Sequence, residues 1–270
     1  MGFLSSLFEG GGKVGHRLIE ASKSGDTETV KSLFAEGADV NASNKDGVTA
    51  LMQASEHGHA EVAELLLAEG ADVNASNKDG VTALMQASEH GHAKVAGLLL
   101  AKGADVNARD KDGWTALILT SWHGHAKVAE LLLNNGADVN AKTTNRVTAL
   151  IRASEKGHAA VVGVLLNKGV DVDARAGDGA TALIRASWHG HAGIVGLLLN
   201  QGADVNARDN SNGTALIRAT WHEHTRVAEL LINKGIDVNA EDNMHATAWM
   251  YASRNKLSKI TALLERHGAH

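Results

Sequence analysis

Closely spaced histidines are the first feature of the sequence whose residue type and spacing suggest chemistry. Neutral imidazole is a common ligand of transition metals, so a series of His-x-His pairs raises the hypothesis of a metal site. The chain has no cysteine, which excludes thiolate ligands, disulfides and cysteine nucleophiles. No acidic ligand accompanies the pairs at one shared position, so we expect a structural role, with no bound metal and no cofactor. The five pairs are His57 and His59, His90 and His92, His123 and His125, His189 and His191, and His222 and His224.

Acidic residues recur at one interval along the chain, which favours a structural role over a catalytic one. Carboxylate and amide side chains in such a pattern are suited to hydrogen-bond the backbone of loops. Motifs of the types GxSxG and HExxH and glycine-rich phosphate loops do not occur, so we expect no enzymatic activity. The recurring acids are Asp39, Asp72, Asp105, Asp138, Asp171, Asp204 and Asp237, and the amides beside them are Asn41, Asn74, Asn107, Asn140, Asn206 and Asn239.

The interval between these residues is that of a repeat of 33 residues. The stretch 46–78 recurs in residues 79–111 with five changes. A period of this length is typical of an array in which each unit is too small to bury its own apolar face and packs on its neighbours. The repeat keeps its length throughout, because one threonine position recurs as Thr49, Thr82, Thr115, Thr148, Thr181, Thr214 and Thr247.

Each repeat contains the signals of two helices and a projecting loop. Thr49 is suited to cap the N-terminus of a first helix, which is expected to end near Gly58. Apolar residues at helical spacing begin again at Val62 and predict a second helix, and Gly70 is suited to a left-handed residue after its C-terminus. The dipeptide Asp79-Gly80 predicts a tight turn at the tip of the following loop.

The segment TALMQASEHGHAEVAELLLAEGADVNA resembles an ankyrin repeat, and the resemblance extends from about His16 to His270. It implies an all-α ankyrin-type solenoid of stacked helix-turn-helix repeats with projecting β-turn or hairpin loops. It also implies that the second histidine of each pair opens the second helix. Alanine replaces the family proline at Ala50 and its equivalents. Apolar residues replace the family histidine, which indicates apolar contacts, at Met52, Met85, Ile118, Ile151, Ile184 and Ile217.

The resemblance also sets the boundaries. We expect an N-terminal extension at residues 1–12 and a single ankyrin domain at 13–270. This domain comprises an N-terminal cap at 13–45, six internal repeats at 46–243 and a C-terminal cap at 244–270.

Two loop tips depart from the repeat pattern. Arg146 stands where other repeats have glycine, and Asn212-Gly213 moves the glycine by one position. A residue other than glycine at positive φ costs on the order of 1 kcal/mol. We therefore expect these two loops to be the least regular.

A function is expected where the repeats differ from one another. The resemblance implies that one face of the first helix lines, with the loop tips, a concave binding groove. That face is polar in the first two repeats and aromatic and basic from the third onward. Residues 1–108 hold 8 Lys and Arg against 15 Asp and Glu, a net charge of −7, whereas residues 109–270 hold 18 against 16, a net charge of +2. The candidate partner-binding residues are Arg109, Trp114, Trp122, His123, Arg152, Lys156, Arg185, Trp188, His189, Arg218, Trp221 and His222.

Tryptophan and arginine are enriched at binding hot spots, and aromatic residues make up only 3% of this chain. We therefore expect a non-catalytic module that binds a protein partner, with an acidic segment, in the groove of repeats 3–6. One alternative is the binding of a polyanion or single-stranded nucleic acid by the same face, against which the net charge of −5 argues. In a further alternative, the arginine and tryptophan side chains only stack on each other and stiffen the groove. In the last, the chain is a duplicated or engineered scaffold without a dedicated ligand.

The remaining expectations concern location. No apolar run approaches the roughly 20 residues that span a bilayer, so we expect a soluble chain. We also expect it to be cytoplasmic and monomeric. The first residues match the MGxxxS pattern for myristoylation at Gly2, with Ser6 in the last place. The structural alternative is a short helix that covers the first repeat with Phe3, Leu4, Leu7 and Phe8.

Overall fold

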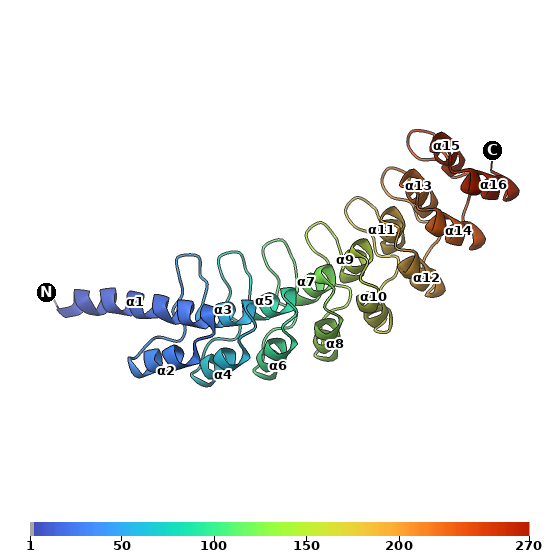
Figure 1. Ribbon diagram of the computed structural model, residues 1–270. Coiled ribbons are helices and arrows are strands. Elements are labelled where there is room, and N and C mark those ends of the chain that lie inside the picture. The colour runs from blue at the N-terminus through green and yellow to red at the C-terminus, as the bar shows by residue number, and fades with distance from the viewer. Residues whose placement is uncertain (1–2, 270) are drawn as a thin grey trace. The chain divides into compact units, whose positions relative to one another are not determined.

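The computed structural model describes residues 3–269, which fold as successive pairs of short helices (Figure 1). Residues 1–138 and 139–270 form two compact units. In the first unit, first helices pack on first helices and second helices on second helices. Its helices are α1 (Phe3–Ser24), α2 (Thr27–Ala35), α3 (Ala50–Glu56), α4 (Ala60–Ala68), α5 (Ala83–Glu89), α6 (Ala93–Ala101), α7 (Ala116–His123) and α8 (Ala126–Asn134).

The second unit repeats this two-layer arrangement, with the loops projecting beside the layer of first helices. The fold is therefore the all-α helical solenoid that the sequence predicts. Its helices are α9 (Ala149–Lys156), α10 (Ala159–Leu166), α11 (Ala182–Trp188), α12 (Ala192–Asn200), α13 (Ala215–Trp221), α14 (Thr225–Asn233), α15 (Ala248–Arg254) and α16 (Ser258–Arg266).

The recurring threonine begins the first helix of each repeat. The Thr49 hydroxyl accepts a hydrogen bond from the backbone N–H of Met52 at 3.3 Å. This bond satisfies one of the N–H groups that have no partner inside the helix. Thr82, Thr115, Thr148, Thr181, Thr214 and Thr247 cap their helices in the same way, so the predicted cap is confirmed. The apolar residues in place of the family histidine are buried in all six internal repeats.

The recurring aspartate and asparagine side chains tie each loop to the next. Asp39 accepts from the N–H of Asn41 at 2.9 Å, and Asn41 accepts from the N–H of Asp72 in the following repeat at 2.8 Å. The amide of Asn74 also donates to the carbonyl of Gly103 at 3.2 Å. These bonds confirm the structural role predicted for the acids.

One loop of the second unit carries a weaker version of this tie. Asp173 stands at the asparagine position and accepts from the N–H of Asp204 at 2.9 Å. A carboxylate has no N–H, so Asp173 cannot donate to the next repeat as Asn74 does.

The prediction that the tips at Arg146 and Asn212 would be the least regular is wrong. Arg146 has φ 60°, Asn212 has φ 60° and Gly47 has φ 81°, so all three adopt the left-handed conformation. The Arg146 N–H donates to Thr143 O at 2.8 Å, as the Gly47 N–H does to Asn44 O at 2.9 Å. The hydrogen bonds of the turn thus impose one backbone path, and they offset the modest cost of a side chain at positive φ.

In the internal repeats, most serines on the first helices are buried without a hydrogen-bond partner for the hydroxyl group, at Ser55, Ser88, Ser154 and Ser187. A buried hydroxyl without a partner costs about 1–3 kcal/mol in mutational data. We expect each Ser→Ala substitution to raise the free energy of unfolding by about 1 kcal/mol, because alanine also has the higher helix propensity. Urea unfolding of the single variants and the quadruple variant measures this gain.

Ser121 provides the matched control for these substitutions. Its hydroxyl donates to the carbonyl of Leu117 at 2.7 Å, although the residue is equally buried. Ser121→Ala should therefore stabilise the chain less than Ser88→Ala. An equal gain at both positions would contradict the explanation.

The expectations for the N-terminus concern mostly atoms that the structure does not describe. Gly2, the predicted myristoylation site, lies outside the described residues. Helix α1 includes the segment predicted as a short helix and continues through residue 12 to Ser24. The side chains of Phe3, Leu4, Leu7 and Phe8 lie outside the described part of the chain. Within residues 3–269, no helix has both the length and the apolar character that crossing a bilayer requires.

Candidate functional site

The predicted binding residues fall into two groups, one in each unit. In the first unit, Trp114 from the loop meets Trp122 from α7 edge to face, with ring centres 5.8 Å apart. His123 follows on α7, with Nε2 at 3.5 Å from a carboxylate oxygen of Glu89, and Arg109 is exposed in the loop. The structure thus brings Trp114 and Trp122 together.

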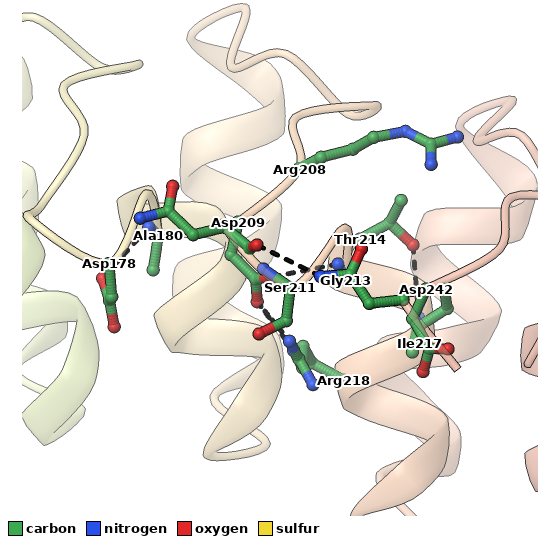
Figure 2. A network of polar contacts seen from close by, with 12 residues as sticks. Asp178, Ala180, Arg208, Asp209, Ser211, Gly213, Thr214, Ile217, Arg218 and Asp242 are labelled. Carbon is green, nitrogen blue, oxygen red and sulfur yellow. Dashed lines mark hydrogen bonds and ion pairs between the residues drawn. The ribbon is translucent and has the colours of Figure 1, made fainter. Parts of the chain in front are cut away.

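The second group is centred on an ion pair that the sequence analysis did not predict. Arg218 on α13 donates from Nε and Nη2 to one carboxylate oxygen of Asp209, at 2.8 and 2.6 Å (Figure 2). The side chains of Arg218 and Asp209 are only 7% and 9% exposed. Asp209 is fixed in turn by the N–H groups of Ser211 and Gly213, both at 2.9 Å. The arginine is therefore held by the loop that directly precedes its own helix.

The other arginines at this helix position pair differently because their loops differ. Ala176 occupies in the preceding loop the position of Asp209. Arg185 instead pairs with Asp178, and this pair is more open, with side chains 24% and 54% exposed. Arg152 pairs with Glu155 on its own helix at 2.9 Å.

Aromatic rings continue from Arg218 along the first helices. The Arg218 guanidinium lies 5.2 Å from the ring centre of Trp188 and 5.8 Å from that of Trp221, distances at which a cation is attracted to the ring face. Trp221 is stacked parallel to Tyr251 with centres 5.4 Å apart, and Trp188 meets His222 at 4.8 Å. Trp188 and Trp221 thus belong to one arginine–aromatic cluster.

Tyr251 links this cluster to a second loop carboxylate. Its hydroxyl donates to Asp242 at 2.7 Å. Burial and this bond raise the pKa of Tyr251 to about 12. Burial alone would raise the pKa of Asp242, but the bonds from Tyr251, Ala246 and Met244, with the charge of Arg218, hold it below its ordinary value. Asp242 is therefore a buried anion at neutral pH.

Within this arginine–aromatic cluster, Asp209, Asp242 and Tyr251 were not among the predicted binding residues. The signal was present, because the loop position of Asp209 varies between repeats as strongly as the helix positions do. In chain order that loop position is occupied by Asn44, Asn77, Asp110, Thr143, Ala176, Asp209 and Asp242.

A pocket of about 440 Å³ lies among these side chains in the second unit. Trp221 and Met244 on its wall are 41% and 65% exposed, among the few large apolar side chains of the described residues that face solvent. Of the predicted residues, Arg185, Trp188, Arg218 and Trp221 line it, whereas Arg152, Lys156, His189 and His222 lie in the same unit outside its lining. The pocket is lined by Asp178, Arg185, Trp188, Asp209, Ser211, Arg218, Trp221, Asp242, Asn243 and Met244.

Comparison with protein families agrees with this architecture. A family model described as ankyrin repeats in three copies matches residues 18–110 and 140–209. Models of a single ankyrin repeat and of ankyrin repeats in many copies match residues 112–144 and 193–232. The chain is an ankyrin repeat protein. Ankyrin repeats are in general protein–protein interaction modules, and a comparison with curated proteins finds no match.

The histidine pairs of this ankyrin repeat protein have structural partners. His92 precedes α6, and its Nε2 lies 3.0 Å from the Glu56 carbonyl oxygen of the preceding repeat. A carbonyl only accepts, so Nε2 carries the hydrogen. The ring packs on Gly58, where a Cβ atom would lie 2.6 Å from Nδ1. Among the described residues no group of three or more metal-binding side chains is placed to hold an ion.

Both partners of this contact are replaced where the C-terminal cap packs on the sixth repeat. Glu223 occupies the glycine position of the sixth repeat with φ 63°, and Leu257 occupies the histidine position of the next repeat. A side chain at the glycine position would fill the space that the imidazole ring occupies elsewhere. The repeat that lacks the glycine is therefore followed by one that lacks the histidine.

The ankyrin repeat protein should lose stability in mild acid because of its histidines. Burial lowers the pKa of His92, His189 and His222 below the ordinary value of 6.5. The unfolded chain binds protons at these positions near pH 6.5, whereas the folded chain binds them only at lower pH. The free energy of unfolding should be highest above pH 6.5 and fall as the pH falls through the folded-state pKa values.

Urea unfolding on both sides of pH 6.5 measures this effect. A variant with glutamine at His92, His189 and His222 should lose less stability on acidification than the unmodified chain. A midpoint that rises as the pH falls would contradict the assignment.

Proposed function

We propose that this ankyrin repeat protein is a non-catalytic module that binds a segment of a partner protein at the pocket of its second unit. The observation that supports this proposal best is the gathering of Trp188, Trp221 and Arg218 around one open pocket. Tryptophan and arginine are the residues most enriched at binding hot spots. A hollow of several hundred Å³ is large enough for a few side chains of a partner.

The ion pairs change what the arginines contribute to such binding. An acidic partner segment, as the sequence predicts, would compete with Asp209 for Arg218 and with Asp178 for Arg185. Breaking the Arg218 pair is costly because both side chains are buried. We therefore assign the arginines mainly to orienting the tryptophan rings, and the exposed part of Trp221 to contact with the partner.

Polyanion or single-stranded nucleic-acid binding is the second candidate. Trp221 could stack on a base, which is worth about 1–3 kcal/mol per base in proteins of that class. Arg185 and Arg218 are paired with Asp178 and Asp209. Less positive charge is therefore available to bind phosphates than the sequence suggests. Binding to single-stranded nucleic acid that weakens steeply with salt, without capture of any protein, would favour this candidate.

The test is partner capture by the chain carrying Trp188→Ala and Trp221→Ala. This double variant should lose capture, whereas Trp249→Ala, which removes a ring that donates to Glu265 at 3.2 Å and lies outside the pocket lining, should retain it. The melting temperature should change little in either variant. A large drop in melting temperature with capture retained would instead support a stiffening role for the rings.

A further inference from the structure

The lining of the pocket carries more negative than positive charge. Three carboxylates, Asp178, Asp209 and Asp242, face two guanidinium groups, those of Arg185 and Arg218. Arg185 and Arg218 are bonded to Asp178 and Asp209. Asp242, only 5% exposed, accepts instead from Tyr251 and from the N–H groups of Met244 and Ala246. The excess negative charge is therefore at the Asp242 end of the pocket.

A neighbouring hollow of about 470 Å³, at the loop tip, also has more carboxylates than guanidinium groups in its lining. It shares Asp242 and Asn243 with the pocket and adds the carboxylates of Asp237 and Glu241, against the guanidinium of Arg208 and the imidazole of His245. Together the two hollows have five carboxylates and three guanidinium groups. A segment that lies across both would meet net negative charge along its length.

The apolar wall of the pocket is suited to the stem of a long cationic side chain. Lysine and arginine pack their methylene groups on apolar surface and keep the charged end near polar groups. Trp221 and Met244, whose side chains are exposed, offer such a surface. A glutamate or aspartate in the same place would approach Asp242 and be repelled.

We propose that the pocket binds a lysine or arginine side chain of a basic partner segment, with the cation between Trp221 and Asp242. The segment continues over the loop tip towards Asp237 and Glu241. This inference rests on the proposed function and reverses the charge of the partner that the sequence predicts. An exposed ring, room for a side chain and an excess of carboxylates occur together at this place.

The test uses the full chain and three short fluorescein-labelled peptides of equal length. One alternates lysine with alanine, the second has glutamate in place of lysine, and the third has norleucine. Fluorescence anisotropy should detect binding of the lysine peptide alone. Tighter binding of the glutamate peptide, or equal binding of the norleucine peptide, would overturn the inference, as would the absence of binding by all three.

Asp242→Asn is the decisive variant. Asn44 accepts the same two loop N–H bonds at the equivalent position, so asparagine keeps the loop folded. We expect the affinity for the lysine peptide to fall about fivefold to tenfold. The matched control is Asp110→Asn, which changes the same loop position in the first unit and should leave binding unchanged. Equal affinity of the Asp242→Asn variant and the unmodified chain would contradict the proposal.

The two proposals fail in different ways. Loss of partner capture by the double tryptophan variant, with a preference for the glutamate peptide, would retain the proposed function and reject the basic segment. Retention of capture by that variant would reject the proposed function, whatever the peptides show.

Discussion

Arg218→Ala should lower the free energy of unfolding by about 3 kcal/mol, because it leaves the buried carboxylate of Asp209 without its cation. The remaining partners of Asp209 are the N–H groups of Ser211 and Gly213, which do not replace a full positive charge. The substitution also removes the guanidinium that lies beside Trp188 and Trp221. Urea unfolding followed by far-ultraviolet circular dichroism measures the loss.

Arg185→Ala is the matched control, since it removes the same side chain one repeat earlier. Its partner Asp178 is more than half exposed, and exposed ion pairs contribute roughly 0–1 kcal/mol. The control should therefore cost much less than Arg218→Ala. Equal losses would mean that burial of the Asp209–Arg218 pair adds nothing.

Gly213→Ala should destabilise the chain by about 2 kcal/mol through the same ion pair. Gly213 does not have positive φ, so its backbone would accept alanine. A Cβ atom there would lie 2.5 Å from the Nε, Cζ and Nη2 atoms of Arg218. The guanidinium would have to leave Asp209, and the buried pair would be lost. Gly213 stands one position later than the glycine of the other loop tips, and it thus leaves space for the guanidinium of Arg218.

A double-mutant cycle separates this explanation from a backbone effect. In the Arg218→Ala background, Gly213→Ala should cost little, which gives a coupling energy of about 2 kcal/mol. Gly193→Ala serves as the opposite control, because it is within α12 and a Cβ atom there would meet no other part of the chain within 4 Å. That substitution should stabilise the chain by up to about 1 kcal/mol. Additive losses at Gly213 and Arg218 would contradict the proposed contact.

The fold was predictable because its signals are local and recur in every repeat. Thr49 and its equivalents cap helices through a bond to the residue three positions on, and Asp39 binds the N–H two positions on. Such contacts depend on the local sequence alone. The family resemblance then supplies the stacking of one repeat on the next.

The candidate site was predictable only in part, because its contacts depend on how each loop folds back on its helix. The tryptophans were found by comparing repeats, since Trp188 and Trp221 occupy one helix position. The pairing of Asp209 with Arg218 joins residues nine positions apart, and that of Asp178 with Arg185 joins residues seven apart. Neither spacing is one at which secondary structure brings side chains together. The charge of the face was therefore judged from arginines whose carboxylate partners were not recognised.

The loop that carries Asp173 differs from the Asp209 loop in how its tip is held. Ala176 stands in this loop where the next loop has Asp209, so the loop lacks the carboxylate that accepts from the N–H groups of Ser211 and Gly213 in the next tip. It leads directly to Asp178 on the pocket wall. Its backbone amides should therefore exchange hydrogen with solvent sooner than those of the Asp209 loop. Such a difference in exchange would make the Asp178 side of the pocket more mobile than the Asp209–Arg218 side.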